Sequence, residues 1–191
     1  MCGRYNFTRV PGDEKMEAIH LAMEKNYPGA YKTGEIFPGD TVPAVLDRDG
    51  KLVAVPAIFG FPGSEENRLL INARAETAAE KKTFAESLRD RRVILPASGF
   101  YEWSHHDREK TKYLFTVDAM QTIYLCGIYK LVDGACRFVI LTRPANESMI
   151  EVHDRMPVIV GEREVRPYLT DRDAAAEILA TAAPTLVRQP A

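Results

Sequence analysis

Cys2, the second residue of this chain, could present two nucleophiles, its thiol and its α-amine. Cys2 directly follows Met1, and an initiator methionine is normally removed when the next side chain is small, which would leave Cys2 with a free α-amine. Both the amine and the thiol are partly deprotonated near neutral pH. An amine forms a Schiff base with an aldehyde, and a neighbouring thiol can then close a five-membered thiazolidine. Cys2 therefore predicts covalent chemistry toward a carbonyl group, although an incidental second-position cysteine is the plainer alternative.

A second candidate is the acidic residue in Gly99-Phe100-Tyr101-Glu102-Trp103. A strand this apolar rarely buries a glutamate without a partner. A carboxyl group in such a setting is suited to general acid–base catalysis, and the neighbouring Trp103, the only tryptophan of the chain, favours a site. The alternative is that Glu102 points to solvent from the other face of the strand.

Asn72 and Arg74 belong to a third candidate segment, Ile71-Asn72-Ala73-Arg74-Ala75-Glu76-Thr77. We expect it at a strand-to-helix junction, where side chains and helix N-terminal amides can converge on an anion. Asn72 could donate to a substrate oxygen, and Arg74 could bind a phosphate through two hydrogen bonds. A helix-capping segment with an exposed arginine is the alternative.

The fourth candidate is His153, in Glu151-Val152-His153-Asp154-Arg155-Met156-Pro157. We expect it in a loop between a short helix and an extended segment, and histidine can exchange a proton near pH 7. A structural pair with Asp154 is the alternative. The remaining histidines, predicted to lie at the surface, are His20, His105 and His106.

Composition predicts an ordinary globular chain rather than a general nucleic-acid binder. Of the 191 residues, 46 % are hydrophobic and 27 % charged, which suffices for the core of one domain. The net charge of −2 means that contact with nucleic acid must come from a local groove. No membrane span or signal peptide is apparent, so we expect a cytoplasmic protein. The basic residues that we interpret as a solvated helix face are Lys81, Lys82, Arg89, Arg91 and Arg92.

The other two cysteines, Cys126 and Cys136, stand among apolar residues and are predicted to be core residues. Three cysteines without a Cys-x-x-Cys spacing make a zinc site or a disulfide framework improbable.

Hydrophobic periodicity and turn residues predict more strands than helices, and the two do not alternate strictly. Asp13 could cap the first helix, and Asp49-Gly50 and Asp133-Gly134 could form turns. The pattern favours an α+β fold, a single domain over residues 1–191 built on a curved, barrel-like mixed β-sheet with flanking helices. Helices are expected over 13–26, 76–88, 146–152 and 173–180; strands over 41–47, 52–61, 92–103, 112–117, 122–129 and 137–142; and an extended segment over 156–160.

Four sequence motifs occur in an order typical of one family. They are Met-Cys-Gly-Arg-Tyr at the start, Asn-Ala-Arg-Ala-Glu-Thr from residue 72, Pro-Ala-Ser-Gly-Phe-Tyr-Glu-Trp from residue 96, and Leu-Thr-Arg-Pro-Ala-Asn from residue 141 followed by Val-His-Asp-Arg-Met-Pro-Val-Ile-Val. From Cys2 to about Leu169 the chain closely resembles the SOS-response-associated peptidase (SRAP) family of abasic-site-processing proteins. Family members usually carry a Trp-Gly-Leu-Ile-Pro-like segment whose aromatic residues pack on bases. Here Phe59-Gly60-Phe61-Pro62-Gly63 replaces it, so Phe59 is the residue that would stack.

This resemblance implies a role for each candidate. Cys2 would form a thiazolidine crosslink with the ring-opened sugar of an abasic site, and Asn72 would orient both partners. Glu102 would shuttle protons during Schiff-base formation and ring closure. His153 would assist opening of the sugar ring or act on the adjacent phosphate oxygen. The implied DNA contacts are Arg4, Arg74, Phe59 and Trp103, and no metal or organic cofactor is required.

The implied partner is single-stranded DNA containing an abasic site, because an unpaired nucleotide enters a pocket without the cost of unstacking a duplex. We expect a monomer without an obligate protein partner, cytoplasmic and nucleoid-associated when bound to damaged DNA, that acts in the SOS response and DNA repair. The resemblance also implies AP-lyase activity and a hydrolase (protease) activity that would here remove only Met1.

Two other functions remain open. An amidohydrolase of the glutaminase type also begins Met-Cys-Gly and uses its α-amine as a base and its thiol to attack an amide, but it leaves Glu102 and His153 without a clear task. A non-catalytic nucleic-acid-binding barrel with an incidental cysteine is the third interpretation.

Overall fold

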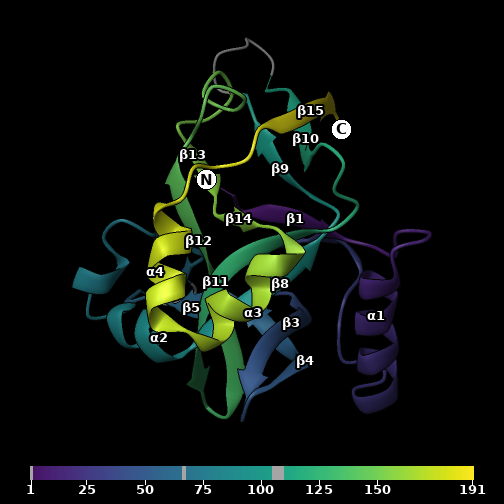
Figure 1. The fold of residues 1–191 in the computed structure, drawn as a ribbon, viewed down its shortest axis with the longest axis vertical. Coiled ribbons are helices and arrows are strands. Elements are labelled where there is room, and N and C mark those ends of the chain that lie inside the picture. The colour runs from purple at the N-terminus through teal and green to yellow at the C-terminus, as the bar shows by residue number, and fades with distance from the viewer. Residues whose placement is uncertain (1, 66–67, 105–109) are drawn as a thin grey trace.

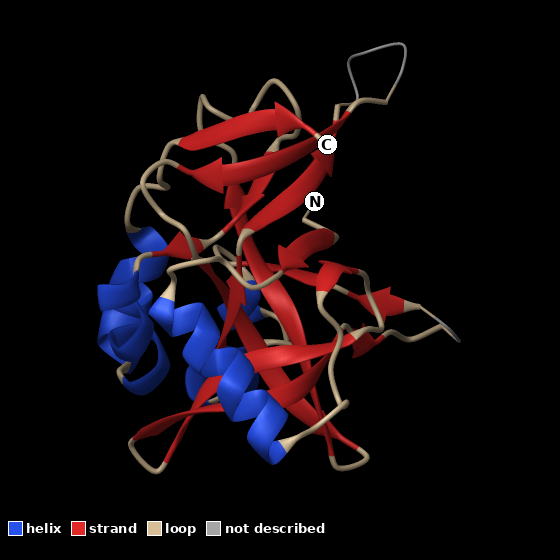
Figure 2. Cartoon of the chain, turned by 90° about the vertical axis from the view of Figure 1, so that its right-hand side faces the viewer, coloured by secondary structure: helices blue, strands red, loops and turns tan. Residues whose placement is uncertain are grey.

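The computed structural model describes residues 2–65, 68–104 and 110–191. Two large β-sheets form its centre, one above the other in Figure 2, and helices cover the outside of the larger one (Figures 1 and 2). The larger sheet is curved and mixed. The α+β class with a barrel-like sheet and flanking helices is therefore confirmed.

Five strands close into a barrel: β3 (Thr41–Arg48), β4 (Lys51–Phe59), β8 (Arg92–Ala97), β11 (Ile123–Val132) and β12 (Ala135–Pro144). They follow the order β12–β4–β3–β8–β11, and β11 pairs again with β12, which closes the ring. Only the pair of β12 with β4 is parallel; the other neighbours are antiparallel. Closure removes free edges from this ring of strands.

Two tight turns join barrel strands where the sequence predicts them. Asp49 and Gly50 connect β3 to β4, and Asp133 and Gly134 connect β11 to β12. Their φ angles of 53°, 80°, 51° and 77° are those of a hairpin turn that needs two left-handed residues in succession. The strands predicted on either side of these turns are confirmed. β4 stops at Phe59 because Gly60 turns the chain with a φ of 110°.

Short strands extend the barrel beside the end of β12. β7 (Asn72–Arg74) runs parallel to β12, with Asn72 opposite Ile140 and Arg74 opposite Thr142. β13 (Arg155–Pro157) runs antiparallel to β12, with Pro157 also opposite Thr142. Two motifs that lie far apart in the sequence are thus held by one strand. Of the remaining short strands, β14 (Ile159–Val160) pairs with β11, and β5 (Phe61–Pro62) pairs with β6 (Leu69–Leu70).

The smaller sheet is antiparallel throughout and has the order β15–β10–β9–β1–β2. Its inner side chains, such as Tyr5, Phe100 and Phe115, share one buried cluster with barrel residues such as Leu95 and Ile140. The core therefore runs continuously between the sheet and the barrel. The strands are β1 (Arg4–Phe7), β2 (Gly34–Ile36), β9 (Gly99–Trp103), β10 (Lys112–Val117) and β15 (Leu186–Pro190).

The strand predicted over 92–103 is in fact two strands in different sheets. The break falls at Ser98, whose N–H donates to the Asn6 carbonyl at 2.9 Å, and the chain leaves the barrel there to enter the smaller sheet. Gly99 makes this crossing possible because a Cβ at this position would lie 2.8 Å from the Phe115 carbonyl oxygen. The crossing places Glu102 in the smaller sheet.

Helices lie on both sides of the barrel (Figure 1). α1 (Glu14–Asn26) confirms the first predicted helix: Asp13 accepts from Lys15 N and Met16 N, and Met16 and Met23 are buried. α4 (Arg172–Ala180) confirms the last one. α3 (Glu162–Thr170) was not predicted: the expected elements nearest to it are the extended segment 156–160 and the helix over 173–180.

Two predicted helices are wrong. The helix over 76–88 breaks into the 3₁₀ turn η1 (Ala78–Glu80) and α2 (Ala85–Asp90), with Lys81 extended between them. A continuous helix would set Ala78 and Phe84 on different faces, whereas both pack on the same buried cluster. The segment 146–152 forms turns only, because the Asn146 side chain accepts from Ser148 N and fixes a local turn.

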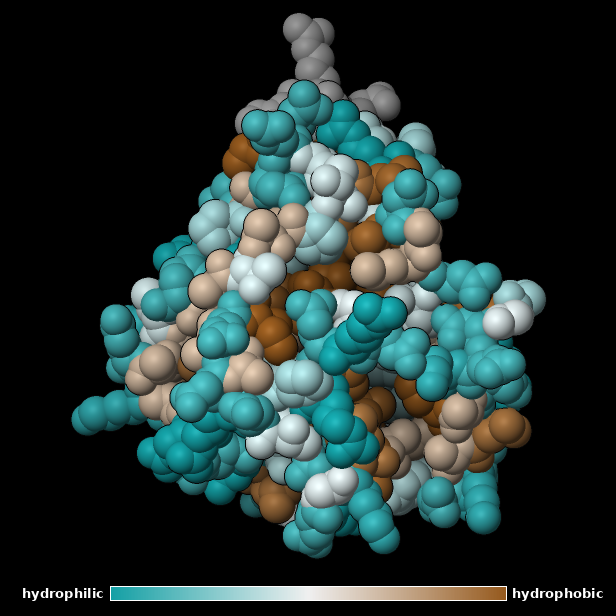
Figure 3. Space-filling model, viewed as in Figure 1, coloured by the Kyte–Doolittle hydropathy of each residue, from teal (hydrophilic) through white to brown (hydrophobic). Residues whose placement is uncertain are grey.

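An apolar groove opens between α1 and α3, over β3 and β4, where apolar side chains gather on the face shown in Figure 3. It measures about 430 Å³ and is lined by residues such as Ile19, Val45 and Leu52. No residue with predicted chemistry lines this groove, so the candidate site lies elsewhere. Among the described residues, no helix is both long enough and apolar enough to cross a membrane.

Candidate active site

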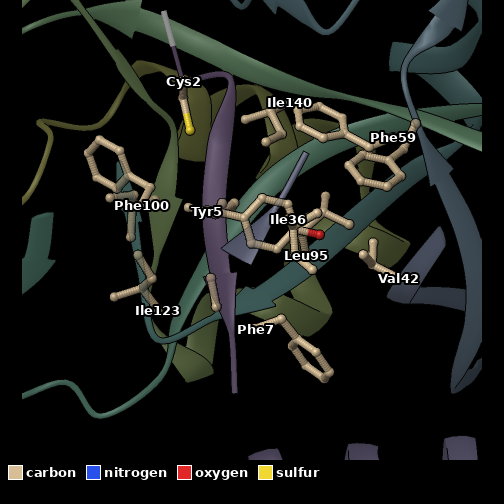
Figure 4. Close-up of a cluster of buried hydrophobic side chains, with 14 of the residues drawn as sticks. Cys2, Tyr5, Phe7, Ile36, Val42, Phe59, Leu95, Phe100, Ile123 and Ile140 are labelled. Atoms are coloured by element: carbon tan, nitrogen blue, oxygen red, sulfur yellow. The ribbon is translucent and has the colours of Figure 1, made fainter. Parts of the chain in front are cut away.

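Cys2 lies at the entry to β1 and is fully buried. Its sulfur lies 3.9 Å from the Arg4 carbonyl oxygen, and Figure 4 shows it pointing into the layer that also holds Phe100 and Ile140. Burial raises the pKa of the Cys2 thiol well above its usual range, and the nearby Glu102 carboxylate raises it further. Both effects disfavour the thiolate form of Cys2.

Asn72 reaches Cys2 directly. Its Nδ2 donates to the Cys2 carbonyl oxygen at 3.1 Å and lies 3.5 Å from the Ile140 carbonyl oxygen. The parallel pairing of β7 with β12 sets this position. Its Oδ1 is buried and has no hydrogen-bond partner among the described residues. Asn72 thus anchors the backbone of Cys2 and retains a buried acceptor, Oδ1, that no described residue uses.

Glu102 is buried, with 5 % of its surface exposed. Its position opposite Tyr113 places it on the inner face of β9, together with Phe100, and it is close enough to Cys2 to raise the pKa of the thiol. The alternative in which Glu102 points to solvent is excluded. Strand alternation instead turns Tyr101 and Trp103 to the outer face.

His153 lies in the loop before β13, and 14 % of its side chain is exposed. Its Nδ1 accepts from the Arg155 N–H at 2.9 Å and lies 2.9 Å from Asp154 Oδ1. The first contact requires a lone pair on Nδ1, and the second favours a proton there. Both contacts are made by the same ring nitrogen. The pair with Asp154 that we named as an alternative is present.

Arg155, which was not among the predicted site residues, connects the segment after His153 with the segment that follows β7. Its guanidinium donates to both carboxylate oxygens of Glu76 and, through Nη2, to the Thr142 carbonyl oxygen at 2.8 Å. These bonds lower the pKa of Glu76, and Arg155 is only 8 % exposed. Both residues stand inside the quoted motifs, but no sequence spacing indicates that they meet.

Arg74 is exposed at the end of β7, two positions after Asn72. The expected helix N-terminus beside it is absent: η1 spans three residues, and the side chain of Thr77 makes no capping hydrogen bond. An anion near Arg74 would therefore be bound by the side chain rather than by helix amides.

Arg4 and Trp103 lie on the outer face of the smaller sheet, with the Arg4 guanidinium carbon 4.8 Å from the centre of the indole ring.

Phe59, the fourth predicted DNA contact, does not lie at the surface. It is fully buried and stacks on Phe138 at 5.0 Å between ring centres, so it has no surface to offer a DNA base. The prediction failed because β4 points Phe59 into the barrel.

The structure buries His20 and Arg92, both of which the sequence predicts at the surface. His20 is buried against Phe7, with 4.5 Å between ring centres, because it lies on the face of α1 that carries Met16 and Met23; burial lowers its pKa. His105 and His106 lie outside the described residues. Arg92 is buried in β8 and donates to the carbonyl oxygens of Tyr168 and Leu169, so it is not part of a solvated helix face.

The other cysteines lie in or beside the core. Cys126 is fully buried and Cys136 partly so. Within the described part of the chain, no cluster of three or more histidine, cysteine or acidic side chains could hold a metal ion.

Comparisons with known proteins add a family relationship to this geometry. The family model described as SOS response associated peptidase (SRAP) matches residues 1–189. The chain is similar to the abasic site processing protein YoqW of Bacillus subtilis (strain 168), with 33 % identity over 192 residues, which covers 94 % of this chain and 84 % of that protein. It is also similar to the abasic site processing protein YedK of Escherichia coli (strain K12), with 28 % identity over 181 residues. This match covers 88 % of this chain and 79 % of that protein.

A solved structure of a protein from Bordetella bronchiseptica has a TM-score of 0.78 to this one and 17 % sequence identity, and the match covers 100 % of this chain and 99 % of that one. At this identity the similarity concerns the fold alone.

Proposed function

This chain belongs to the SOS response associated peptidase (SRAP) family, and from that premise we propose that it processes abasic sites in DNA by bonding covalently to them through Cys2. The observation that supports this most is the convergence of Asn72 and Glu102 on a cysteine that becomes N-terminal once Met1 is removed. The relatives named above as abasic site processing proteins support the substrate class.

The proposed reaction begins with the α-amine of Cys2. It adds to the aldehyde of the ring-opened sugar, and loss of the resulting hydroxyl group as water gives an imine. The Cys2 sulfur then attacks the imine carbon, the thiol proton passes to a base, and the nitrogen takes up a proton. The product is a thiazolidine that links sugar and protein, and no redox partner is required.

The raised pKa of the thiol supports this order of steps. A buried thiol that keeps its proton is a weak nucleophile toward the free aldehyde, so the amine reacts first. Once the imine has formed, its electrophilic carbon lies within the same residue, and ring closure needs only a base for the thiol proton. Glu102 is the carboxylate near Cys2 and would serve as that base.

Asn72 and His153 would have separate tasks. Asn72 holds the Cys2 carbonyl group and so fixes the direction of the amine, which reduces the entropy cost of reaching the aldehyde. His153 would assist opening of the closed sugar, which needs a proton moved between two oxygen atoms. AP-lyase cleavage would compete only while the imine persists, and autopeptidase activity would expose the amine.

Single-stranded DNA is the substrate that we propose, because a splayed abasic nucleotide can reach a buried cysteine without unstacking a duplex. A chain of net charge −2 would bind it through a local set of cations, and a covalent bond would then retain it. We propose that the protein acts as a monomeric single domain in the cytoplasm, at damaged DNA, without a cofactor.

The direct test is incubation with a single-stranded oligonucleotide that carries one abasic site, followed by denaturing electrophoresis. We expect a shifted band with this DNA and none with an intact or duplex oligonucleotide of equal length. A glutaminase assay on the same preparation tests the amidohydrolase alternative. Turnover of glutamine without a shifted band would contradict the proposal.

Glu102→Gln should slow crosslinking by about 10²–10⁴-fold, the usual contribution of a general acid–base group. The amide keeps the shape of the side chain but cannot accept the thiol proton. Rates come from single-turnover gels, and affinity for intact single strands should stay unchanged because Glu102 faces inward. Glu177→Gln is the matched control, an exposed glutamate in α4, away from the smaller sheet. Crosslinking at the wild-type rate would remove Glu102 from the site.

Arg74→Ala should weaken non-covalent binding of single-stranded DNA and reduce the salt dependence by about one phosphate contact. Arg74 is exposed beside Asn72, where a phosphate next to the lesion would lie. Titrations at several salt concentrations measure the effect. Charge reversal at Lys81 and Lys82, which are exposed between η1 and α2, should matter less, and the opposite ranking would place the DNA on another face.

A further inference from the structure

Cations and aromatic rings gather on the outer face of the smaller sheet. Arg4 stands opposite Tyr101, and Lys112 stands opposite Trp103. Side chains paired across antiparallel strands share a face, so all four point away from the core, and all four are partly exposed. Glu102, between Tyr101 and Trp103, points the other way.

The cationic groups of Arg4 and Lys112 lie over aromatic rings of this face. The Lys112 ammonium group is 4.0 Å from the centre of the Tyr101 ring, and the Arg4 guanidinium carbon is 4.3 Å from that of Phe37 and 4.8 Å from that of Trp103. Alternating cations and rings suit an unpaired nucleic-acid strand, because bases stack on rings while phosphates pair with cations. Cys2 precedes Arg4 by two residues. A nucleic-acid strand bound on this face would therefore pass close to Cys2, where the abasic site would react.

The carboxylate of Glu35 contacts both Arg4 and Lys112. One carboxylate oxygen lies 3.3 Å from Arg4 Nη1, and the other accepts from Lys112 Nζ at 2.8 Å. Burial acts to raise the pKa of Glu35, but the contacts with Lys112 and Arg4 outweigh it and lower the pKa overall, so the group is ionised at neutral pH. Each oxygen holds one cation, as the oxygens of a phosphate group would.

We propose that Glu35 stands in for a DNA phosphate on this face, and that an unpaired strand must displace it from Arg4 and Lys112 in order to bind. The inference rests on the proposed function, since it concerns the strand that flanks the abasic site. Displacement of Glu35 would make the protein select DNA that carries an abasic site over intact single strands. Intact single strands bind weakly because they compete with an internal anion, and the covalent step at Cys2 then retains only DNA that carries the lesion.

The test compares two variants that each neutralise one carboxylate. Glu35→Gln removes the competing charge and should tighten binding of an intact single-stranded oligonucleotide about three- to tenfold at low salt, with a steeper salt dependence because two cations become available. Asp90→Asn is the matched control: Asp90 contacts Arg89 and Arg172 at the end of α2, so the net charge changes equally. A second substitution, Lys112→Ala, should remove most of the gain in Glu35→Gln.

Fluorescence anisotropy gives the affinities, and circular dichroism checks folding. Binding by Glu35→Gln that is no tighter than binding by Asp90→Asn would overturn the role of Glu35. Crosslinking of abasic DNA by the wild-type protein is measured separately. Its absence would contradict the proposed function, whereas normal crosslinking with equal affinities of the two variants would contradict the inference alone.

Discussion

Cys2→Ser should lose the adduct that survives denaturation, while a Schiff base that borohydride can trap remains. The variant keeps its α-amine and can still form the imine with the sugar aldehyde. Ring closure then requires the serine hydroxyl, which is far less acidic than a thiol, so the imine persists. It either hydrolyses on denaturation or proceeds to β-elimination. We therefore expect more strand cleavage from Cys2→Ser than from the wild-type protein.

Denaturing gels with and without borohydride measure both outcomes on the same abasic oligonucleotide. Cys2→Ala should behave like Cys2→Ser, because neither closes the ring. Cys136→Ser is the matched control: it removes a different thiol, partly buried at the start of β12, and should crosslink like the wild type. A Cys2→Ser variant that forms the stable adduct as well as the wild type would show that the thiol is dispensable.

The parts of the fold that local signals determine could be predicted. Asp13 caps α1 and Met16 and Met23 face the core, and the Asp-Gly pairs form their two turns. The break at Ser98 could not be predicted, because residues on both sides are apolar and strand-forming. Two tertiary contacts accompany the change from β8 to β9: the Ser98 N–H donates to the Asn6 carbonyl oxygen, and Gly99 packs against the Phe115 carbonyl group.

The candidate site was predictable where a residue type is chemically unusual in its local setting. A second-position cysteine and a glutamate in an apolar strand stand out in the sequence, and the structure buries both. The contact between Asn72 and Cys2 and the pair of Arg155 with Glu76 depend on strands that meet only after folding. Phe59 shows the reverse: a position suggested by resemblance alone turned out to face the barrel interior.

A chain that keeps any residue ahead of Cys2 should form no denaturation-stable adduct with abasic DNA. The nitrogen of Cys2 is then part of an amide, whose lone pair is delocalised, so it cannot form an imine. The thiol cannot replace it. Its pKa is raised by burial, and its addition to an aldehyde would give only a reversible hemithioacetal.

The measurement uses two fusions of the same tag. An amino-terminal tag is compared before and after cleavage by a protease that leaves Cys2 first, and a carboxy-terminal tag controls for its bulk. Intact-mass spectrometry of the protein and of the crosslinked product shows which species reacted, which matters because the protein could remove the tag itself. A product whose mass still includes residues ahead of Cys2 would contradict the mechanism.

Together the two experiments separate the nucleophiles of Cys2. The serine variant keeps the amine and removes the thiol, whereas the extended chain keeps the thiol and removes the amine. If the amine acts first, the serine variant yields a trappable imine and the extended chain yields nothing that borohydride can trap. If the thiol acted first, the extended chain would retain a weak adduct that denaturation releases, and the serine variant would show no reaction. The buried thiol favours the first pattern, because burial and Glu102 raise its pKa, whereas a free α-amine, with an ordinary pKa of roughly 7.7–8.0, is partly unprotonated near neutral pH.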